Sequence, residues 1–158
     1  MLILLSGLAG CGKDTFADYL CKHHSFQKRA FADVLKREVS DLYNIPLNYF
    51  YDRDKKDTNY HGITPREKLI DYANQKRKID PLYFAKKIEL PEGNVVISDC
   101  GFLNEQEYFP EGITVWIERS IPEIFDNREI QKSDCKIILY NESPFDGDKL
   151  WEQFKKNE

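Results

Sequence analysis

Leu2-Ile-Leu-Leu-Ser6 runs directly into Gly7-Leu-Ala-Gly-Cys-Gly-Lys13-Asp-Thr15, and this junction is the most informative part of the sequence. The first five residues form an apolar run that ends at a glycine, which predicts a buried strand. Lys13–His23 places Phe16 and Leu20 at helical spacing, which predicts a helix. A strand that turns through a glycine-rich loop into a helix is the context that a phosphate-binding loop requires.

The loop supplies the groups that hold phosphate at such junctions. Its glycines let successive N–H groups face one anion, and the helix adds the positive end of its dipole. Lys13 adds a full charge for the β- and γ-phosphates of ATP. The residues predicted to contact the nucleotide are Leu8, Ala9, Gly10, Cys11, Gly12, Lys13, Asp14 and Thr15. The strict motif has a hydroxyl directly after the lysine as a Mg²⁺ ligand, whereas here Asp14 intervenes and the hydroxyl belongs to Thr15.

Apolar runs and helical periods alternate along the rest of the chain. Further strands are expected at Phe26–Ala32, Val95–Ile97, Ile113–Ile117 and Lys136–Tyr140. This alternation predicts an α/β fold, with a five-stranded parallel sheet and helices on both of its faces. Ligands bind such sheets at the carboxyl ends of the strands, so the strand–helix junctions are the candidate site.

Capping residues predict the starts of three further helices. Asp33 stands where it could cap a helix. The apolar face of that helix would be Val34, Leu35, Val39 and Leu42. Thr64-Pro-Arg-Glu67 places Thr at the cap, Pro at the first position and Glu where it closes a capping box. Asp80-Pro81 repeats the signal for a helix that ends near Leu90.

Composition excludes several classes of function. The 158 residues are 41% hydrophobic and 32% charged, which fits one folded domain. A net charge of −4 argues against binding of a nucleic acid through a basic face. No apolar run reaches the roughly 20 residues of a membrane span. The four cysteines lack metal-knuckle or redox spacing, so reduced thiols and a cytoplasmic location are expected.

Several segments together resemble the bacteriophage-type deoxynucleoside monophosphate kinases. Gly12-Lys-Asp-Thr-Phe-Ala-Asp-Tyr-Leu20 and Ala30-Phe-Ala-Asp-Val-Leu-Lys36 match that family's Gly-Lys-Asp-Thr and Phe-Ala-Asp-x-Leu-Lys segments. The resemblance continues in order through Thr64-Pro-Arg-Glu-Lys-Leu69, Asp80-Pro-Leu-Tyr-Phe84, Val95-Val-Ile-Ser-Asp99 and Tyr140-Asn-Glu-Ser143. It implies one P-loop kinase domain over residues 1–158, a three-layer sandwich with an acceptor-binding subdomain at about 36–90 and a lid at about 120–134.

A second family shares part of the pattern. Gln75-Lys-Arg-Lys-Ile-Asp-Pro-Leu-Tyr-Phe-Ala-Lys-Lys87 is similar to a segment of animal-type phosphomevalonate kinases, which also share the Gly-Lys-Asp loop. The chain departs from both families at Gly101, where they have an arginine two residues after the aspartate that ends the strand.

The candidate residues outside the loop follow from position and from the resemblance. Asp99 follows an apolar strand as a Walker B carboxylate does, so Asp99, with Thr15, is the expected Mg²⁺ site. Arg66 opposes the helix dipole, which a bound acceptor phosphate would explain. The resemblance adds Asp33 and Lys36 to the acceptor site. It also implies a lid arginine that neutralises the transferred phosphoryl group, for which Arg128 is the first choice and Arg119 the alternative.

The sequence therefore predicts an ATP- and Mg²⁺-dependent kinase that phosphorylates a (deoxy)nucleoside monophosphate. Its partners would be small molecules, with neither nucleic acid nor membrane, and monomer and homodimer both stay open. Two alternatives also stay open. One is a kinase for phosphomevalonate or another small phosphate ester. The other is a P-loop nucleotide-binding switch or accessory protein without an acceptor.

Overall fold

A computed structural model describes residues 1–52, 54–59, 62–120 and 129–158. The chain forms two compact units. Unit 1 consists of Met1–Ala30 and Glu89–Glu158, and unit 2 consists of Phe31–Ile88. Each unit is described separately.

Unit 1 is built on a parallel sheet of five strands in the order β2-β3-β1-β4-β5. The strands are β1 (Leu2–Ser6), β2 (Phe26–Arg29), β3 (Asn94–Ile97), β4 (Ile113–Glu118) and β5 (Ile137–Tyr140). Every residue of β1 is buried, which is why its sequence is continuously apolar rather than alternating. The α/β fold with a five-stranded parallel sheet is confirmed.

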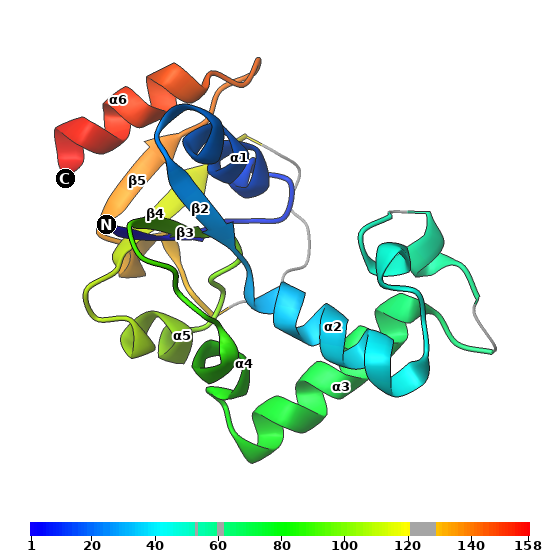
Figure 1. Ribbon diagram of the computed structural model, residues 1–158. Helices are drawn as coiled ribbons and strands as arrows, with labels where there is room; N and C mark the ends of the chain where they lie inside the picture. Colours follow the sequence, from blue (N-terminus) through cyan, green and yellow to red (C-terminus); the bar gives the residue numbers. More distant parts are fainter. Residues whose placement is uncertain (53, 60–61, 121–128) are drawn as a thin grey trace. The chain divides into compact units, whose positions relative to one another are not determined.

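Helices cover both faces of this sheet (Figure 1). They are α1 (Lys13–His23), α5 (Leu103–Tyr108) and α6 (Gly147–Asn157), and a short 3₁₀ helix, η3, spans Lys132–Asp134. The crossovers from β1 to β2 and from β3 to β4 run in opposite directions across the sheet, so right-handed connections place α1 and α5 on opposite faces. The core lies between α1, α6 and the sheet, with Phe16, Leu20 and Phe154 fully buried in it.

Unit 2 is helical. It contains α2 (Phe31–Tyr43), α3 (Pro65–Ile79) and α4 (Tyr83–Lys87), with 3₁₀ helices η1 (Leu47–Phe50) and η2 (Lys55–Asp57). Glu38 on α2 ties the three α-helices together. Its carboxylate accepts hydrogen bonds from the hydroxyls of Tyr72 at 3.1 Å and Tyr83 at 3.2 Å, and it pairs with Lys87.

The start of α2 differs from the prediction. The second strand ends at Arg29 rather than Ala32, and α2 begins at Phe31, so Asp33 lies inside the first helical turn and is not the N-cap. An acidic residue is favourable at either position because of the helix dipole, which is why sequence alone misplaced the boundary. Leu42, predicted on the buried face, is 60% exposed.

The other two predicted helix starts had different outcomes. The capping box of α3 is confirmed, with Glu67 N donating to Thr64 Oγ1 and Thr64 N donating to Glu67 Oε2. Asp80, by contrast, ends α3, and its carboxylate accepts from Leu82 N at 3.0 Å. The helix that follows is only Tyr83–Lys87, because the backbone is extended at Ile88, and it does not reach Leu90.

Among the described residues, no helix is both long and apolar enough to cross a membrane.

Candidate functional site

The loop between β1 and α1 is bent at positions where a side chain has no room. At Gly7, φ is +135°, and a Cβ would lie 2.5 Å from Ile117 O at the neighbouring strand β4. At Gly12, φ is +105°, and a Cβ would lie 2.4 Å from Asn141 Nδ2. These conformations favour glycine, and each contact excludes any larger residue. The predicted glycine-rich bend is therefore present between strand and helix.

Lys13 is turned inward over its own loop. Its Nζ donates to Gly7 O at 2.7 Å and to Leu8 O at 2.8 Å, and it lies 3.7 Å from Cys11 Sγ. Only 8% of the residue is exposed. A single ammonium group is thus concentrated at the loop of a protein that is acidic overall, which is what phosphate binding there requires.

Asp14, the residue after this lysine, connects α1 to two strands. Its Oδ1 accepts from Ser98 Oγ at 3.0 Å and from Lys28 Nζ at 2.9 Å. Lys28 also pairs with Asp18 at 3.0 Å. Desolvation acts to raise the pKa of Asp14, but Lys28, Ser98 and Lys13 together hold this pKa below its ordinary value. Asp14 is therefore an ionised carboxylate beside the loop, and both Asp14 and Thr15 are exposed on α1.

Asp99 lies two residues beyond the end of β3 and directly follows Ser98. The main chain here is tied to the end of β1, because Ser6 Oγ donates to Cys100 O at 2.9 Å. Burial, and then the charges of Glu105 and Asp99, raise the pKa of the Cys100 thiol. The structure thus brings the segment that carries Asp99 to the same sheet edge as Lys13 and Asp14.

Gly101, the position at which the chain departs from related kinases, organises the next segment. Its N–H donates at 3.1 Å to the carboxylate of Glu105, which is 2% exposed. Its carbonyl accepts from Glu129 N at 2.9 Å and from Ile130 N at 3.2 Å. Gly101 thereby holds the chain that leads into β5.

The predicted lid arginine Arg128 lies outside the described residues. Arg119, the alternative, follows β4 and lines a small cavity together with Leu8, Cys11 and Glu118. Lys132 of η3 lies at the same edge, where its Nζ is 3.6 Å from a carboxylate oxygen of Glu118. Arg119 is therefore the described arginine that borders the loop.

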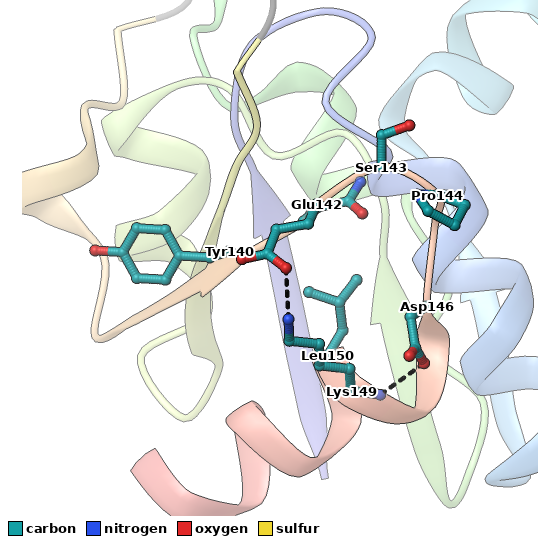
Figure 2. Close-up of a pocket in the computed structure, with 8 residues that line it drawn as sticks. Tyr140, Glu142, Ser143, Pro144, Asp146, Lys149 and Leu150 are labelled. Atoms are coloured by element: carbon teal, nitrogen blue, oxygen red, sulfur yellow. Dashed lines mark hydrogen bonds and ion pairs between the residues drawn. The ribbon is translucent and has the colours of Figure 1, made fainter.

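A cavity of about 200 Å³ lies between the end of β5 and the start of α6. Figure 2 shows the Glu142 carboxylate and the Lys149 ammonium facing each other beside it, with the Tyr140 ring pointing away. Asn141 also lines this cavity, and its Nδ2 donates to Cys11 O at 2.7 Å. The cavity is thus joined to the phosphate loop by one hydrogen bond.

Two of the predicted acceptor residues, Asp33 and Lys36, lie together in unit 2. Asp33 Oδ1 accepts from the Tyr51 hydroxyl at 2.7 Å and is 3.6 Å from Lys36 Nζ. The same ammonium lies 3.9 Å from the centre of the Tyr51 ring. Burial and the bond to Asp33 raise the pKa of Tyr51 to about 12. These three side chains form a polar cluster on α2 and the segment after η1.

Arg66, the third acceptor residue, forms a separate pair. Its guanidinium makes a bidentate contact with Asp57 of η2, through Nε to Oδ1 and through Nη2 to Oδ2 at 2.9 Å. The hydrogen bond from Arg66 lowers the pKa of Asp57, desolvation opposes this effect, and the charges of Arg66 and Lys56 add to the lowering. Asp57 thus offers a second explanation for an arginine in the first turn of α3, beside the acceptor phosphate that the sequence suggested.

Among the described residues, sequence reasoning missed Lys28, Ser98 and Asn141, whose side chains bond the loop or the first turn of α1. Ser98 and Asn141 lie inside segments that match the kinase pattern, so that match was the available signal. Lys28 gave none, because a lysine in an edge strand is ordinary.

The donor set fits a nucleotide whose Mg²⁺ is held mainly by phosphate and water. The described residues contain no group of three or more His, Cys, Asp or Glu side chains that could hold a metal. Mg²⁺ commonly takes one or two carboxylates and keeps several waters, so Asp99 and Asp14 match the number of protein ligands that such an ion takes. Thr15 stays a predicted ligand.

Known proteins that are similar to this chain in sequence or in structure include two that are named as kinases. No protein-family model matches the chain. The chain is 29% identical over 144 residues to a protein of Acanthamoeba polyphaga mimivirus named "Putative deoxynucleotide monophosphate kinase", which covers 75% of this chain and 74% of the relative. A structural likeness with a TM-score of 0.49 and 17% identity, over 99% of this chain and 95% of the other, links it to shikimate kinase from Aquifex aeolicus vf5. The parallel sheet and the glycine-bent loop with its inward lysine form an α/β fold of the P-loop kind, and the chain is similar in sequence to a viral protein named as a deoxynucleotide monophosphate kinase.

Proposed function

We propose that this protein transfers the γ-phosphate of ATP to a (deoxy)nucleoside monophosphate. The observation that carries the proposal is the loop from Gly7 to Lys13, which follows a central strand of a parallel sheet and holds a buried ammonium. The name of the mimiviral relative supports a deoxynucleotide monophosphate as the acceptor. Phosphoryl transfer needs positioning and positive charge more than covalent chemistry, and this loop supplies both.

Lys13 would move from its own loop to the nucleotide. Its present acceptors, Gly7 O and Leu8 O, are neutral carbonyls. A charge-assisted hydrogen bond to a phosphate oxygen is stronger than a hydrogen bond to a carbonyl. The ammonium would therefore leave the two carbonyl oxygens and bind phosphate oxygens instead. The N–H groups of residues 8–13 would share the remaining phosphate charge.

A magnesium ion bound with ATP would neutralise charge on the β- and γ-phosphates. Asp99 would hold it, through water or directly, and Asp14 would lie beside it as a carboxylate fixed by Ser98 and Lys28. The acceptor needs no strong general base, because an oxygen of its phosphate is already ionised. Arg128 or Arg119 would offset the charge on the transferred group.

On the acceptor side, Lys36 and Arg66 would bind the monophosphate, with Asp33 orienting Lys36. Arg66 would have to release the Asp57 carboxylate in order to bind the acceptor phosphate. Its planar guanidinium can make two parallel hydrogen bonds to either group. The basic residues that resemble phosphomevalonate kinases are engaged within unit 2, where Lys76 lies over Tyr72 and Arg77 over Phe84. The name of the mimiviral relative makes the nucleotide the acceptor proposed first.

A panel of acceptors tests the proposal. The full chain is incubated with ATP and Mg²⁺ and with each ribo- and deoxyribonucleoside monophosphate in turn, and ADP release is followed by a coupled assay. Phosphomevalonate is included as a further acceptor. Turnover with one or a few nucleoside monophosphates is expected.

Two other outcomes have defined meanings. Turnover with phosphomevalonate alone would replace the nucleotide acceptor with a small phosphate ester. ATP binding with no turnover on any acceptor would favour a nucleotide-binding switch or accessory protein, and failure to bind ATP would contradict the proposal as a whole.

A further inference from the structure

We propose that Asn141 is a positioning residue that fixes the direction of the Gly12 N–H, one of the amide donors in the phosphate loop. This inference rests on the proposed binding of a nucleotide at the loop. Asn141 acts through a main-chain peptide, at a distance of 130 residues along the sequence.

Asn141 is anchored on one side and reaches the loop on the other. It directly follows β5, and its own N–H donates to Glu118 O, the last residue of β4, at 2.8 Å. Its side-chain Nδ2 donates to Cys11 O at 2.7 Å. The residue is 4% exposed, so the bond is shielded from water. Two neighbouring strands thus hold one hydrogen-bond donor against the phosphate loop.

Because of peptide geometry, the contact between Asn141 Nδ2 and Cys11 O also sets the direction of the Gly12 N–H. The carbonyl of Cys11 and the N–H of Gly12 belong to one peptide unit, which is planar and trans. In such a unit the C=O and the N–H point in opposite directions. Because the carbonyl points to Asn141, the Gly12 N–H points away from Asn141, where a bound phosphate can accept its hydrogen bond.

This peptide needs an anchor. Gly12 has a φ of +105°, in a region that glycine enters as readily as its mirror image. A peptide next to glycine can therefore rotate, which would aim the carbonyl oxygen at the phosphate and remove a donor. The same glycine makes room for the anchor, since a Cβ at position 12 would lie 2.4 Å from Asn141 Nδ2.

The other half of the amide bears on why an asparagine stands here. Asn141 Oδ1 is buried and makes no hydrogen bond within the described part of the chain. A buried acceptor without a partner costs stability. An apolar residue of similar shape would avoid that cost but would leave Cys11 O without this hydrogen bond. The Nδ2 donor therefore accounts for the asparagine.

The test compares Asn141→Leu and Asn141→Asp with the wild type. Both variants remove the donor, but Asp also adds a negative charge beside the loop, so Asn141→Leu is the variant that isolates the hydrogen bond. Gln153→Ala is the matched control, because Gln153 is an amide that also bonds the main chain at the end of β5, through Tyr140 N at 2.8 Å and Tyr140 O at 3.2 Å. Affinities for Mg²⁺-ATP and for tripolyphosphate, which has no base or sugar, are measured by calorimetry, and melting temperatures by circular dichroism.

Asn141→Leu should lose affinity for both probes by about tenfold, as expected for one shielded hydrogen bond, and Asn141→Asp should lose more because its carboxylate also repels phosphate. The melting temperature of Asn141→Leu should stay within about 4 °C of the wild type, and Gln153→Ala should bind normally. In the wild type, the ¹⁵N–¹H signal of Gly12 should move strongly when tripolyphosphate is added, and this movement should be smaller in Asn141→Leu.

Each other result overturns the inference in a distinct way. Weaker binding of ATP with unchanged binding of tripolyphosphate would place Asn141 at the base instead of the loop. A lowered melting temperature with normal affinity would make the contact purely structural. An unmoved Gly12 signal in a wild type that binds tripolyphosphate would also contradict it. A wild type that binds neither probe would overturn the proposed function, and this inference with it.

Discussion

Lys13 shows how one side chain can serve two partners. In the structure its ammonium bonds Gly7 O and Leu8 O, and a nucleotide would replace these carbonyls with phosphate oxygens. Lys13→Ala should therefore lower kcat by about 100-fold or more, because a charge directed at the transferred phosphoryl group is removed. Steady-state assays measure this. Lys155→Ala, which removes an exposed ion pair with Glu152, should keep full activity. An unchanged rate in Lys13→Ala would remove this residue from the mechanism.

Alanine substitutions at Gly12 and Gly93 distinguish the effect of backbone strain from the effect of a steric clash. Their φ values are +105° and +98°, but a Cβ at Gly93 would have nothing within 4 Å. Ala at either position should lower the free energy of unfolding by about 1–2 kcal/mol through backbone strain. Gly12→Ala should also displace Asn141 Nδ2 and weaken ATP binding. Chemical denaturation and calorimetry test both effects, and equal ATP affinity in the two variants would contradict the steric argument.

At the residue scale, the sequence predicted what is close along the chain and missed what is close only in space. The loop residues from Leu8 to Thr15 belong to one segment, so their spacing was enough to predict the glycine-rich bend between strand and helix. Ser98 and Asn141 reach the loop region across 84 and 130 residues. No local pattern contains such a contact, because it depends on which strands become neighbours in the sheet.

At the scale of elements, the end of α1 is clamped to α6 by aromatic rings. The His24 ring stacks on Trp151 with centroids 4.3 Å apart, and its Nε2 lies 3.2 Å from the Tyr19 hydroxyl, which bonds Asp148. Burial, and then the charge of His23, lower the pKa of His24 below 6.5, with Asp148 opposing and Lys155 adding to this effect.

This clamp should make stability depend on pH. The unfolded chain takes up a proton near pH 6.5, while the folded chain does so only at lower pH, so the stabilisation is present above about pH 6.5 and is lost as the pH falls below it. Urea unfolding at several pH values measures this loss. His24→Phe keeps a ring on Trp151 without a titrating group and should flatten the pH profile. An equal slope in this variant would exclude His24 as the cause.

Element types were predicted more reliably than element ends. All five predicted strands are present in the structure, with helices around them. The pattern of apolar residues predicted them because it reflects which residues are buried, as in β1, where every residue is buried. The helix starts that were predicted at Asp33 and Asp80 were wrong for the same reason. An aspartate can cap a helix, lie in its first turn or close the end of the helix before it, and only the tertiary partners, Tyr51 and Lys86, decide between these positions.

At the scale of the whole molecule, the chain leaves unit 1 and returns to it at one place. Arg29 Nε donates to Glu89 O at 3.1 Å, so the two ends that border unit 2 lie together within unit 1. A variant in which a short Gly/Ser linker replaces Phe31–Ile88 should therefore fold and bind ADP through the loop. It should not phosphorylate any acceptor, because Asp33, Lys36 and Arg66 are gone.

Calorimetry with ADP and the acceptor panel test this variant, with the intact chain as the control. Turnover by the shortened chain would place the acceptor site outside unit 2. Loss of ADP binding in a shortened chain that keeps a cooperative melting transition would mean that unit 2 is needed at the nucleotide site.

The meeting of Arg29 with Glu89 also bears on how such a protein can diversify. A segment whose two ends emerge side by side can be exchanged as a cassette, while the sheet, the loop and the Asn141 contact keep their sequence. Under the proposed function, new acceptor preferences could then arise by recombination in one contiguous stretch, without changes to the loop that is proposed to bind ATP.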